Sequence, residues 1–469
     1  MKRGDNPKLI NPQKLDPAKI SGRLLPFNSK YDNKPTLAYA SDGRLVMLSF
    51  HQHTEYGNYN TEWTRHTVQY TSSDWGESWD SGRQVEIAEE PSLMQLRDGT
   101  MLVLGMGLHP RWNGVGIRHN SRAYSENYWD NRVVFRSQDA GQTWEAVPIT
   151  VELLPDEADF DKQQFKGSLL GSYSLLELNN GVVLINVYTY SDQRPIREYL
   201  LRSHDQGQSW IAERMVFADD FINDFLNKDP YGLNENVLFY SPRGRVMMFS
   251  RTEVDHLRGC NIPGLVLPGE KTGIDQSSSL LLFESPDGGV TWKTTRGFGI
   301  PGMMYPSVLR LDDTRMLITY TMRMVPRPEY DYPYAHIGVH AVVAEELPDG
   351  TIDVDFAHDI IVIDDLTPDN ATSGGGFGKT VRLPDGSLLT PYSYRAISPR
   401  MSEILDKELY LDPEVFEAAR QASPFTGPRF KLNPDWPKAL VRHHFTDYFA
   451  HDTGEAREKV EILKWQLSV

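Results

Sequence analysis

Three ionisable side chains stand together in the segment HQHTE, where His51, His53 and Glu55 follow an apolar run. Histidine changes charge near neutral pH, so it can donate or accept a proton during a reaction. A carboxylic acid with a raised pKa can protonate a leaving group while a second carboxylate acts as the base. Glu55 or His53 could pair in this way with the distant Glu235, so the segment indicates acid–base chemistry.

The His-x-His spacing also permits metal chelation, because residues two apart lie on the same side of a strand. No third ligand is evident in the sequence around His51 and His53. We therefore expect no metal, and nothing in the sequence indicates a cofactor.

These residues lie at the ends of apolar strands in a pattern that occurs six times. Each copy has two apolar runs around Asp-Gly or a related pair, which is a strong β-hairpin signal. The copies span residues 34–50, 90–106, 172–188, 235–251, 305–323 and 378–395. Residues before each first strand and after each second strand should meet on the face away from the turns. The candidate site residues on that face are His51, His53, Glu55, Glu90, His109, Tyr188, Glu235, Arg251, Tyr305, Arg323, Phe377, Tyr394 and Arg395.

A second phrase, Ser-x-Asp-x-Gly-x-Ser/Thr-Trp, occurs at 72–79, 136–144, 202–210 and 284–292. Its Asp can accept hydrogen bonds from turn amides, and its Gly tolerates positive φ. Its Trp should begin the returning strand and pack between units. The two patterns together predict an all-β, six-bladed β-propeller with one domain over 1–469, closed by a strand at 459–467.

Three insertions interrupt this ring, at about 217–231, 253–278 and 400–437, and the first and third look partly helical. Such insertions serve as lids, pocket walls or oligomer contacts. The net charge of −16 argues against binding to nucleic acid or to anionic membranes. One cysteine and the absence of an apolar N-terminal segment lead us to expect a cytoplasmic protein, unless a signal peptide has been removed.

The Trp phrase is identified as the Asp-box, or BNR repeat, and the chain resembles the sialidase superfamily of six-bladed propellers over nearly its whole length. The resemblance implies that Glu235, Arg251 and Arg323 belong to the site. Two departures are evident, because Asn33-Lys34-Pro35 replaces the family's Arg-Ile-Pro and Phe377 replaces its nucleophilic Tyr. The family's general-acid Asp is also missing after the first hairpin. A conventional retaining sialidase is therefore not expected.

We expect a glycoside hydrolase that acts on terminal sugars, acidic ones included. The candidate catalytic residues are His51, His53, Glu55, Glu235 and Tyr188. The candidate substrate-binding residues are Arg251, Arg323, His109, Glu90, Tyr305, Phe377, Tyr394 and Arg395. Two alternatives stay open. One is a uronate lyase that uses Tyr188, His109 and Arg251, and the other is a glycan-binding propeller without turnover.

Overall fold

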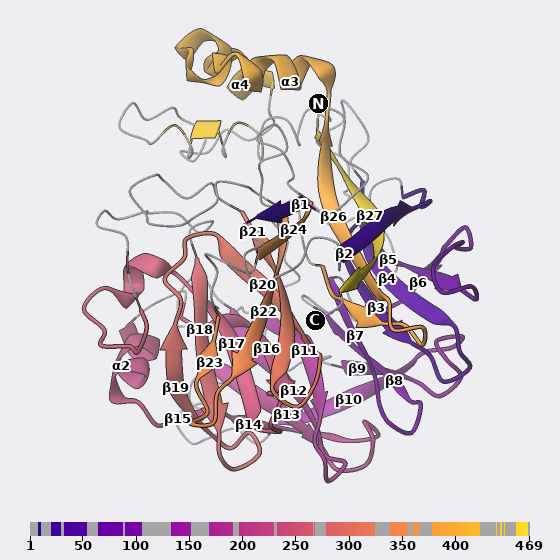
Figure 1. The fold of residues 1–469 in the computed structure, drawn as a ribbon, viewed down its shortest axis with the longest axis vertical. Helices are drawn as coiled ribbons and strands as arrows, with labels where there is room; N and C mark the ends of the chain where they lie inside the picture. Colours follow the sequence, from indigo (N-terminus) through magenta and orange to yellow (C-terminus); the bar gives the residue numbers. More distant parts are fainter. Residues whose placement is uncertain are drawn as a thin grey trace.

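The chain is built mainly of β-sheets in a propeller-like arrangement, with a few short helices (Figure 1). The computed structural model describes residues 8–10, 20–29, 32–53, 64–87, 90–105, 133–151, 168–190, 197–228, 232–265, 267, 278–323, 338–354, 360–364, 378–422, 438, 441–442, 445 and 456–467. The strands of these residues form five sheets.

The first two sheets contain four and eight strands. The four-stranded sheet is made of β3 (Asp32–Tyr39), β4 (Leu45–His53), β5 (Thr64–Ser72) and β6 (Arg83–Val85). The eight-stranded sheet is made of β7 (Pro91–Gln95), β8 (Met101–Gly105), β9 (Val133–Ser137), β10 (Glu145–Val151), β11 (Ser168–Glu177), β12 (Val183–Tyr190), β13 (Glu198–Ser203) and β14 (Trp210–Arg214). Parallel pairing of β10 with β14 joins two antiparallel sets of four strands into this larger sheet.

The other three sheets contain five, six and four strands. The five-stranded sheet is made of β15 (Val216–Phe217), β16 (Asn234–Tyr240), β17 (Val246–Thr252), β18 (Ser279–Ser285) and β19 (Thr291–Gly297). The six-stranded sheet is made of β1 (Lys8–Ile10), β20 (Met303–Arg310), β21 (Arg315–Met322), β22 (Gly338–Glu346), β23 (Ile352–Asp353) and β24 (Ile360–Asp364). The last sheet is made of β2 (Ile20–Leu25), β25 (Val381–Arg382), β26 (Leu388–Ile397) and β27 (Ala456–Leu467).

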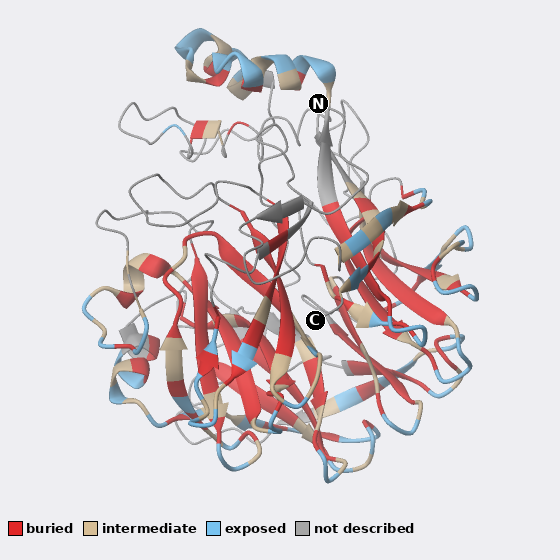
Figure 2. Ribbon diagram, viewed as in Figure 1, coloured by how far each residue is buried: buried red, intermediate tan, exposed pale blue. Residues whose placement is uncertain are grey.

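All six predicted apolar hairpins are present as antiparallel strand pairs. The pairs are β3–β4, β7–β8, β11–β12, β16–β17, β20–β21 and β25–β26. The first strands of successive pairs pack against one another, β3 on β7, β7 on β11, β11 on β16 and β16 on β20. Figure 2 shows that buried residues follow the strands and that exposed residues collect in the turns. The first strands therefore lie inside the arrangement, and their ends can converge on one site.

The four Trp phrases form turns held by their Asp and Ser side chains. In the second phrase, Asp139 Oδ1 accepts hydrogen bonds from the Thr143 amide and the Ser137 hydroxyl, at 2.9 and 2.8 Å. The returning strand begins at Trp210 in the third phrase, as predicted. It begins at Thr291, one residue before Trp292, in the fourth. In the first phrase it begins only at Arg83, so that part of the prediction was wrong there.

The predicted closing strand at 459–467 lies within β27, which pairs with β26 on one side and with β2 on the other. Strands from both ends of the sequence thus share one sheet. The Val460 amide also donates a hydrogen bond of 2.9 Å to the Ser29 hydroxyl.

Within the described residues, the helices that follow lie in the three predicted insertions, with α3 beginning one residue before the third. The first contains α2 (Asp220–Lys228), and the second contains the short 3-10 helix η2 (Val254–Leu257). The third contains α3 (Pro399–Asp406), η5 (Leu409–Leu411) and α4 (Pro413–Ala422), so its predicted helix is broken in the middle. In Figure 1, α3 and α4 lie at the top of the view, beyond the end of β26.

Candidate functional site

Four residues at the same position of the first, second, fourth and fifth hairpins share an unusual backbone conformation. Lys34, Glu90, Glu235 and Tyr305 have φ values of 48°, 47°, 50° and 51°. Each lies eight residues before the first residue of the Asp-Gly or related pair in its hairpin. Non-glycine residues rarely adopt positive φ, and each instance costs about 1–3 kcal/mol. A conformation repeated at this cost marks a position where the direction of the side chain matters.

A shift in strand pairing accompanies the left-handed residue in three of these hairpins. The register changes between Asn33 and Thr36, between Asn234 and Val237, and between Met304 and Ser307. Such β-bulges bend a strand and redirect a side chain, and they are common next to active sites. The bulges thus interrupt the regular alternation of side chains between the two faces of the sheet at Lys34, Glu235 and Tyr305.

Two of these residues belong to a chain of hydrogen bonds that we call the Tyr305 cluster, made of Arg251, Glu235, Tyr305 and Arg323. Arg251 Nη1 lies 2.7 Å from Glu235 Oε2, and the Tyr305 hydroxyl donates to Glu235 Oε1 at 3.2 Å. Arg323 Nη2 donates to the Tyr305 oxygen at 2.9 Å, and its guanidinium stands 4.5 Å from the centre of the tyrosine ring. All four residues are only 6–7% exposed. The phenol therefore lies between a carboxylate that can take its proton and a cation that can stabilise the resulting charge.

Burial is the main influence on this phenol, and it raises the pKa of Tyr305. The positive charge of Arg323 acts in the opposite direction, Glu235 raises the pKa further, and Arg251 lowers it. Tyr305 is therefore a neutral phenol at neutral pH. It can become a phenolate only when a neighbouring base accepts its proton as the reaction proceeds.

The other two left-handed residues form an ion pair, with Lys34 Nζ 2.5 Å from Glu90 Oε2. The charge of Glu90 also acts on the hydroxyl of Tyr305, which places the pair near the Tyr305 cluster. Asn33 occupies the position at which the resemblance led us to expect an arginine, and Lys34 follows it directly. A cation thus lies next to that position, although a lysine does not offer the two-pronged carboxylate contact of a guanidinium.

A second group of polar residues lies at the end of the first hairpin. His51 Nδ1 lies 2.8 Å from Oδ1 of Asp32, and the Tyr70 hydroxyl donates to the other carboxylate oxygen at 2.5 Å. The Asp32 side chain is 1% exposed and that of His51 is 18% exposed. Burial and the Asp32 charge raise the pKa of Tyr70, so its hydroxyl stays a donor. A buried carboxylate on Nδ1 fixes the orientation of the imidazole ring, the arrangement found in histidines that transfer protons.

The structure brings six predicted residues into these groups and leaves others elsewhere. Glu90, Glu235, Arg251, Tyr305 and Arg323 lie in or beside the Tyr305 cluster, and His51 contacts Asp32. Tyr188 is 3% exposed on β12. The side chains of His53, Tyr394 and Arg395, and the whole of Glu55, His109 and Phe377, lie outside the described residues. Sequence reasoning did not identify Asp32 or Tyr70.

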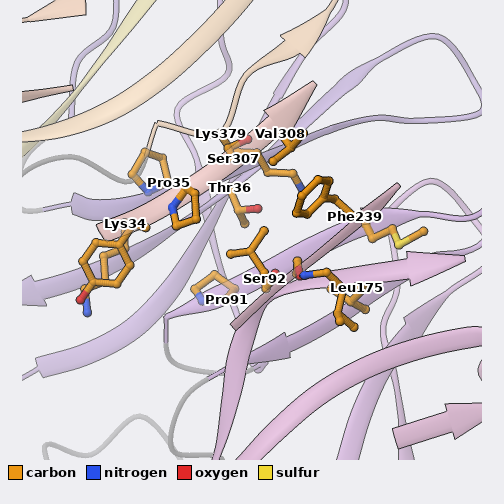
Figure 3. A pocket seen from close by; sticks show the side chains of 16 residues that line it. Lys34, Pro35, Thr36, Pro91, Ser92, Leu175, Phe239, Ser307, Val308 and Lys379 are labelled. Atoms are coloured by element: carbon orange, nitrogen blue, oxygen red, sulfur yellow. The ribbon is translucent and has the colours of Figure 1, made fainter. Parts of the chain in front are cut away.

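A cavity of about 160 Å³ lies among the first strands, with Lys34 and Tyr305 in its wall (Figure 3). Its wall also contains residues from β7, β11 and β16, as well as Lys379, just before β25. We call it the central cavity, because strands of four of the five sheets line it and Lys379 precedes a strand of the fifth.

Among the described residues, no group of three or more His, Cys, Asp or Glu side chains is placed to hold a metal ion. In that same part of the chain, none of the helices is long and apolar enough to span a membrane.

The fold and this cluster define an all-β protein of propeller-like architecture with a polar site at the ends of its inner strands. No protein-family model matches the chain, and no curated protein matches it. A solved structure of a Dyadobacter fermentans protein of unknown function is 20% identical, with a TM-score of 0.52. The match covers 80% of this chain and 95% of that one, and it shows a shared fold.

Solved sialidase structures also match, with lower scores. The NanB sialidase from Streptococcus pneumoniae is 14% identical over 78% of this chain and 65% of its own, with a TM-score of 0.46. The intramolecular trans-sialidase from Ruminococcus gnavus is 13% identical over 78% of this chain and 90% of its own, with a TM-score of 0.47. These matches describe chain geometry and carry no statement about activity.

Proposed function

We propose that this protein is a glycoside hydrolase that acts on terminal, acidic sugars, and that the Tyr305 cluster is its reaction centre. The observation that carries the proposal is the run of contacts from Arg251 through Glu235 and Tyr305 to Arg323. It supplies a nucleophile, a base and two cations within one nearly buried group. The cations of this group would attract a carboxylate on the sugar.

The proposed reaction begins with attack of the Tyr305 oxygen on the anomeric carbon. The phenol proton passes to Glu235, the glycosidic bond breaks, and the leaving oxygen receives a proton from His51. Asp32 holds His51 in place for this transfer. Water then attacks the anomeric carbon, the bond to Tyr305 breaks, and the sugar leaves while the protons return to Tyr305 and His51.

The location of the nucleophile would explain the phenylalanine at 377. Tyr305 lies eight residues before Asp313, and Phe377 lies eight residues before Asp385, so the two occupy equivalent positions in successive hairpins. The family that the sequence resembles has its tyrosine near the second position. In this protein, we propose that the hydroxyl is supplied one hairpin earlier, where it is in contact with Glu235.

The proposal also covers the number of propeller blades and the nature of the Trp turns. Six blades would follow from the six hairpins, with the parallel β10–β14 pairing linking the outer strands of two neighbouring blades. The four Trp turns would be Asp-boxes. Their Asp side chains hold the turns at the ends of strands away from Glu235, which supports a structural role for them.

The test uses glycans that end in sialic or uronic acids, with released sugar as the readout. Tyr305→Phe should lower kcat/KM by at least about a hundredfold, the scale of a lost catalytic group. The matched control is Tyr240→Phe, because Tyr240 lies at the turn end of β16, where its hydroxyl accepts a hydrogen bond from the Asn179 amide. A fluorinated substrate analogue should form an adduct that peptide mass spectrometry locates on Tyr305.

Other outcomes would replace the proposal. Undiminished turnover by the folded Tyr305→Phe variant would exclude Tyr305 as the nucleophile. An unsaturated uronate among the products, detected by its ultraviolet absorbance, would instead show a lyase. Retention on a glycan array without any product would show a binding protein.

A further inference from the structure

The central cavity has a regular lining that comes from the hairpin repeat. Two residues after each left-handed position, or its equivalent, a side chain faces this space. Five of the six are polar: Thr36, Ser92, Ser174, Ser307 and Lys379, with Val237 as the sixth. Figure 3 shows Thr36, Ser92, Ser307 and Lys379 around the same hollow. These six positions thus carry one ammonium group and four hydroxyl groups, and the wall also includes Tyr305 and Lys34, which is paired with Glu90.

The ammonium group of Lys379 has little to balance its charge. Its one hydrogen bond within the described part of the chain goes to the carbonyl oxygen of Leu93, although an ammonium group carries three donors. No Asp or Glu is among the described residues that line the cavity. Burial lowers the pKa of Lys379 to about 8, so the side chain is still mostly protonated at neutral pH. A buried charge in this state favours a counter-ion beside it.

The hydroxyl groups are also set up as donors. Thr36 Oγ1 accepts a hydrogen bond from the Leu93 amide at 3.2 Å, and Ser174 Oγ accepts one from the Leu238 amide. Each hydroxyl therefore keeps its own hydrogen for another partner. Ser92 is 2% exposed, and its Oγ has no hydrogen-bond partner among the described residues. A ring of O–H groups around an ammonium group is chemically suited to an anion.

We propose that the central cavity binds a small monovalent inorganic anion of chloride size, held by Lys379 and by the hydroxyl groups of Ser92, Thr36 and Ser174. The volume of about 160 Å³ accommodates one such ion with water. Leu175, Val237 and Phe239 supply apolar wall, which suits a weakly hydrated ion better than a multivalent one. Water alone would satisfy the donors but would leave the lysine charge unbalanced.

The site adjoins the Tyr305 cluster, because Tyr305 and Lys34 contribute to the cavity wall while Tyr305 also contacts Glu235 and Arg323. An anion beside Lys379 would screen the charge of that lysine from the reaction centre. Binding of the anion is therefore a property separate from sugar hydrolysis, and it can be measured whether or not the protein turns over a glycan.

The direct test is crystallography of the full chain after a bromide soak. The expected result is an anomalous difference peak in the central cavity within contact distance of Lys379 Nζ, and no such peak in Lys379→Met. The matched control is Lys407→Met, because Lys407 is an exposed lysine on the protein surface, paired with Glu403. A cavity that holds only water after the soak would overturn the proposal.

A solution test covers the case in which Lys379→Met does not fold. Thermal unfolding is followed while chloride replaces gluconate at constant ionic strength. The melting temperature of the unsubstituted protein should rise with the logarithm of the chloride concentration once this exceeds the dissociation constant, and Ser92→Ala should shift the concentration at which the rise begins upward by about tenfold, the scale of one lost bond to an ion. The same chloride response in both proteins would contradict the assignment of Ser92, and no response in either would reject the site.

Discussion

Glu198 provides a sharp test of the electrostatics of the interior. It is 3% exposed on β13, and its Oε2 accepts hydrogen bonds from the amide groups of Asn186 and Asn236, at 2.9 and 2.7 Å. Burial raises the pKa of Glu198 well above its usual range, although the two hydrogen bonds lower it in part. The side chain is therefore neutral in the folded protein. Glu198→Gln should keep its shape and both hydrogen bonds.

The magnitude follows from proton linkage. In the unfolded chain, Glu198 loses its proton near pH 4.3, about the value for an isolated glutamate. A raised folded pKa gives a contribution to stability that is complete below that pH and is lost as the pH rises toward the folded pKa. Glutamine does not titrate, so Glu198→Gln should gain about 1.4 kcal/mol per pH unit over the original protein for as long as the pH lies above the unfolded pKa and below the folded pKa.

The assay is urea unfolding of both proteins at several pH values between 5 and 7, followed by tryptophan fluorescence. The difference in unfolding free energy should grow with pH and become constant above the folded pKa. Glu403→Gln is the control, because Glu403 is an exposed residue on α3, paired with Lys407, and should show no growing gain. If the unfolding free energies of Glu198→Gln and the original protein differ by the same amount at every pH, the carboxyl group of Glu198 is not neutral in the folded protein.

Two further predictions concern the turns. Gly207→Ala should lower the melting temperature more than Gly181→Ala. Both glycines have φ near +84°, but only a Cβ at 207 would lie 2.7 Å from Leu102. The expected difference in the free energy of unfolding is about 1–3 kcal/mol, and equal losses would show that Leu102 moves aside at no cost. Partial burial opposes the shift, but hydrogen bonds from Thr143 hold the pKa of Asp139 below its usual value. Asp139→Asn should therefore destabilise at pH 7, and urea unfolding should show this loss shrinking below about pH 4, where the original carboxylate is also protonated.

The repeat made part of the site predictable. Glu235 and Tyr305 occupy the same place in their hairpins, so hairpin geometry alone puts both on the face away from the turns. Their hydrogen bond depends on how the five-stranded and six-stranded sheets pack, since β16 and β20 belong to different sheets. No periodicity in the sequence encodes that packing. Tyr305 was accordingly predicted only as a binding residue.

The contact between Asp32 and His51 was hidden by a single inserted residue. Tyr39 pairs with Leu45, and an unbroken register from there would pair Asn33 with His51. The bulge shifts the pairing by one position, so Asp32 lies opposite His51 instead. A shift of one residue exchanges the two faces of a strand. Pro35 next to Lys34 was the only visible sign of irregularity, and a proline before a strand does not specify a bulge.

The pairing of β2 with β27 has a consequence for synthesis of the protein. The ribosome makes β2 early, but its partner contains Leu467, more than four hundred residues later. Until that segment emerges, β2 has no strand beside it and β26 exposes an open edge. Such edges recruit strands from other chains. The nascent protein is thus prone to aggregate until β27 appears, and chaperones that cover β-strands would matter most before that moment.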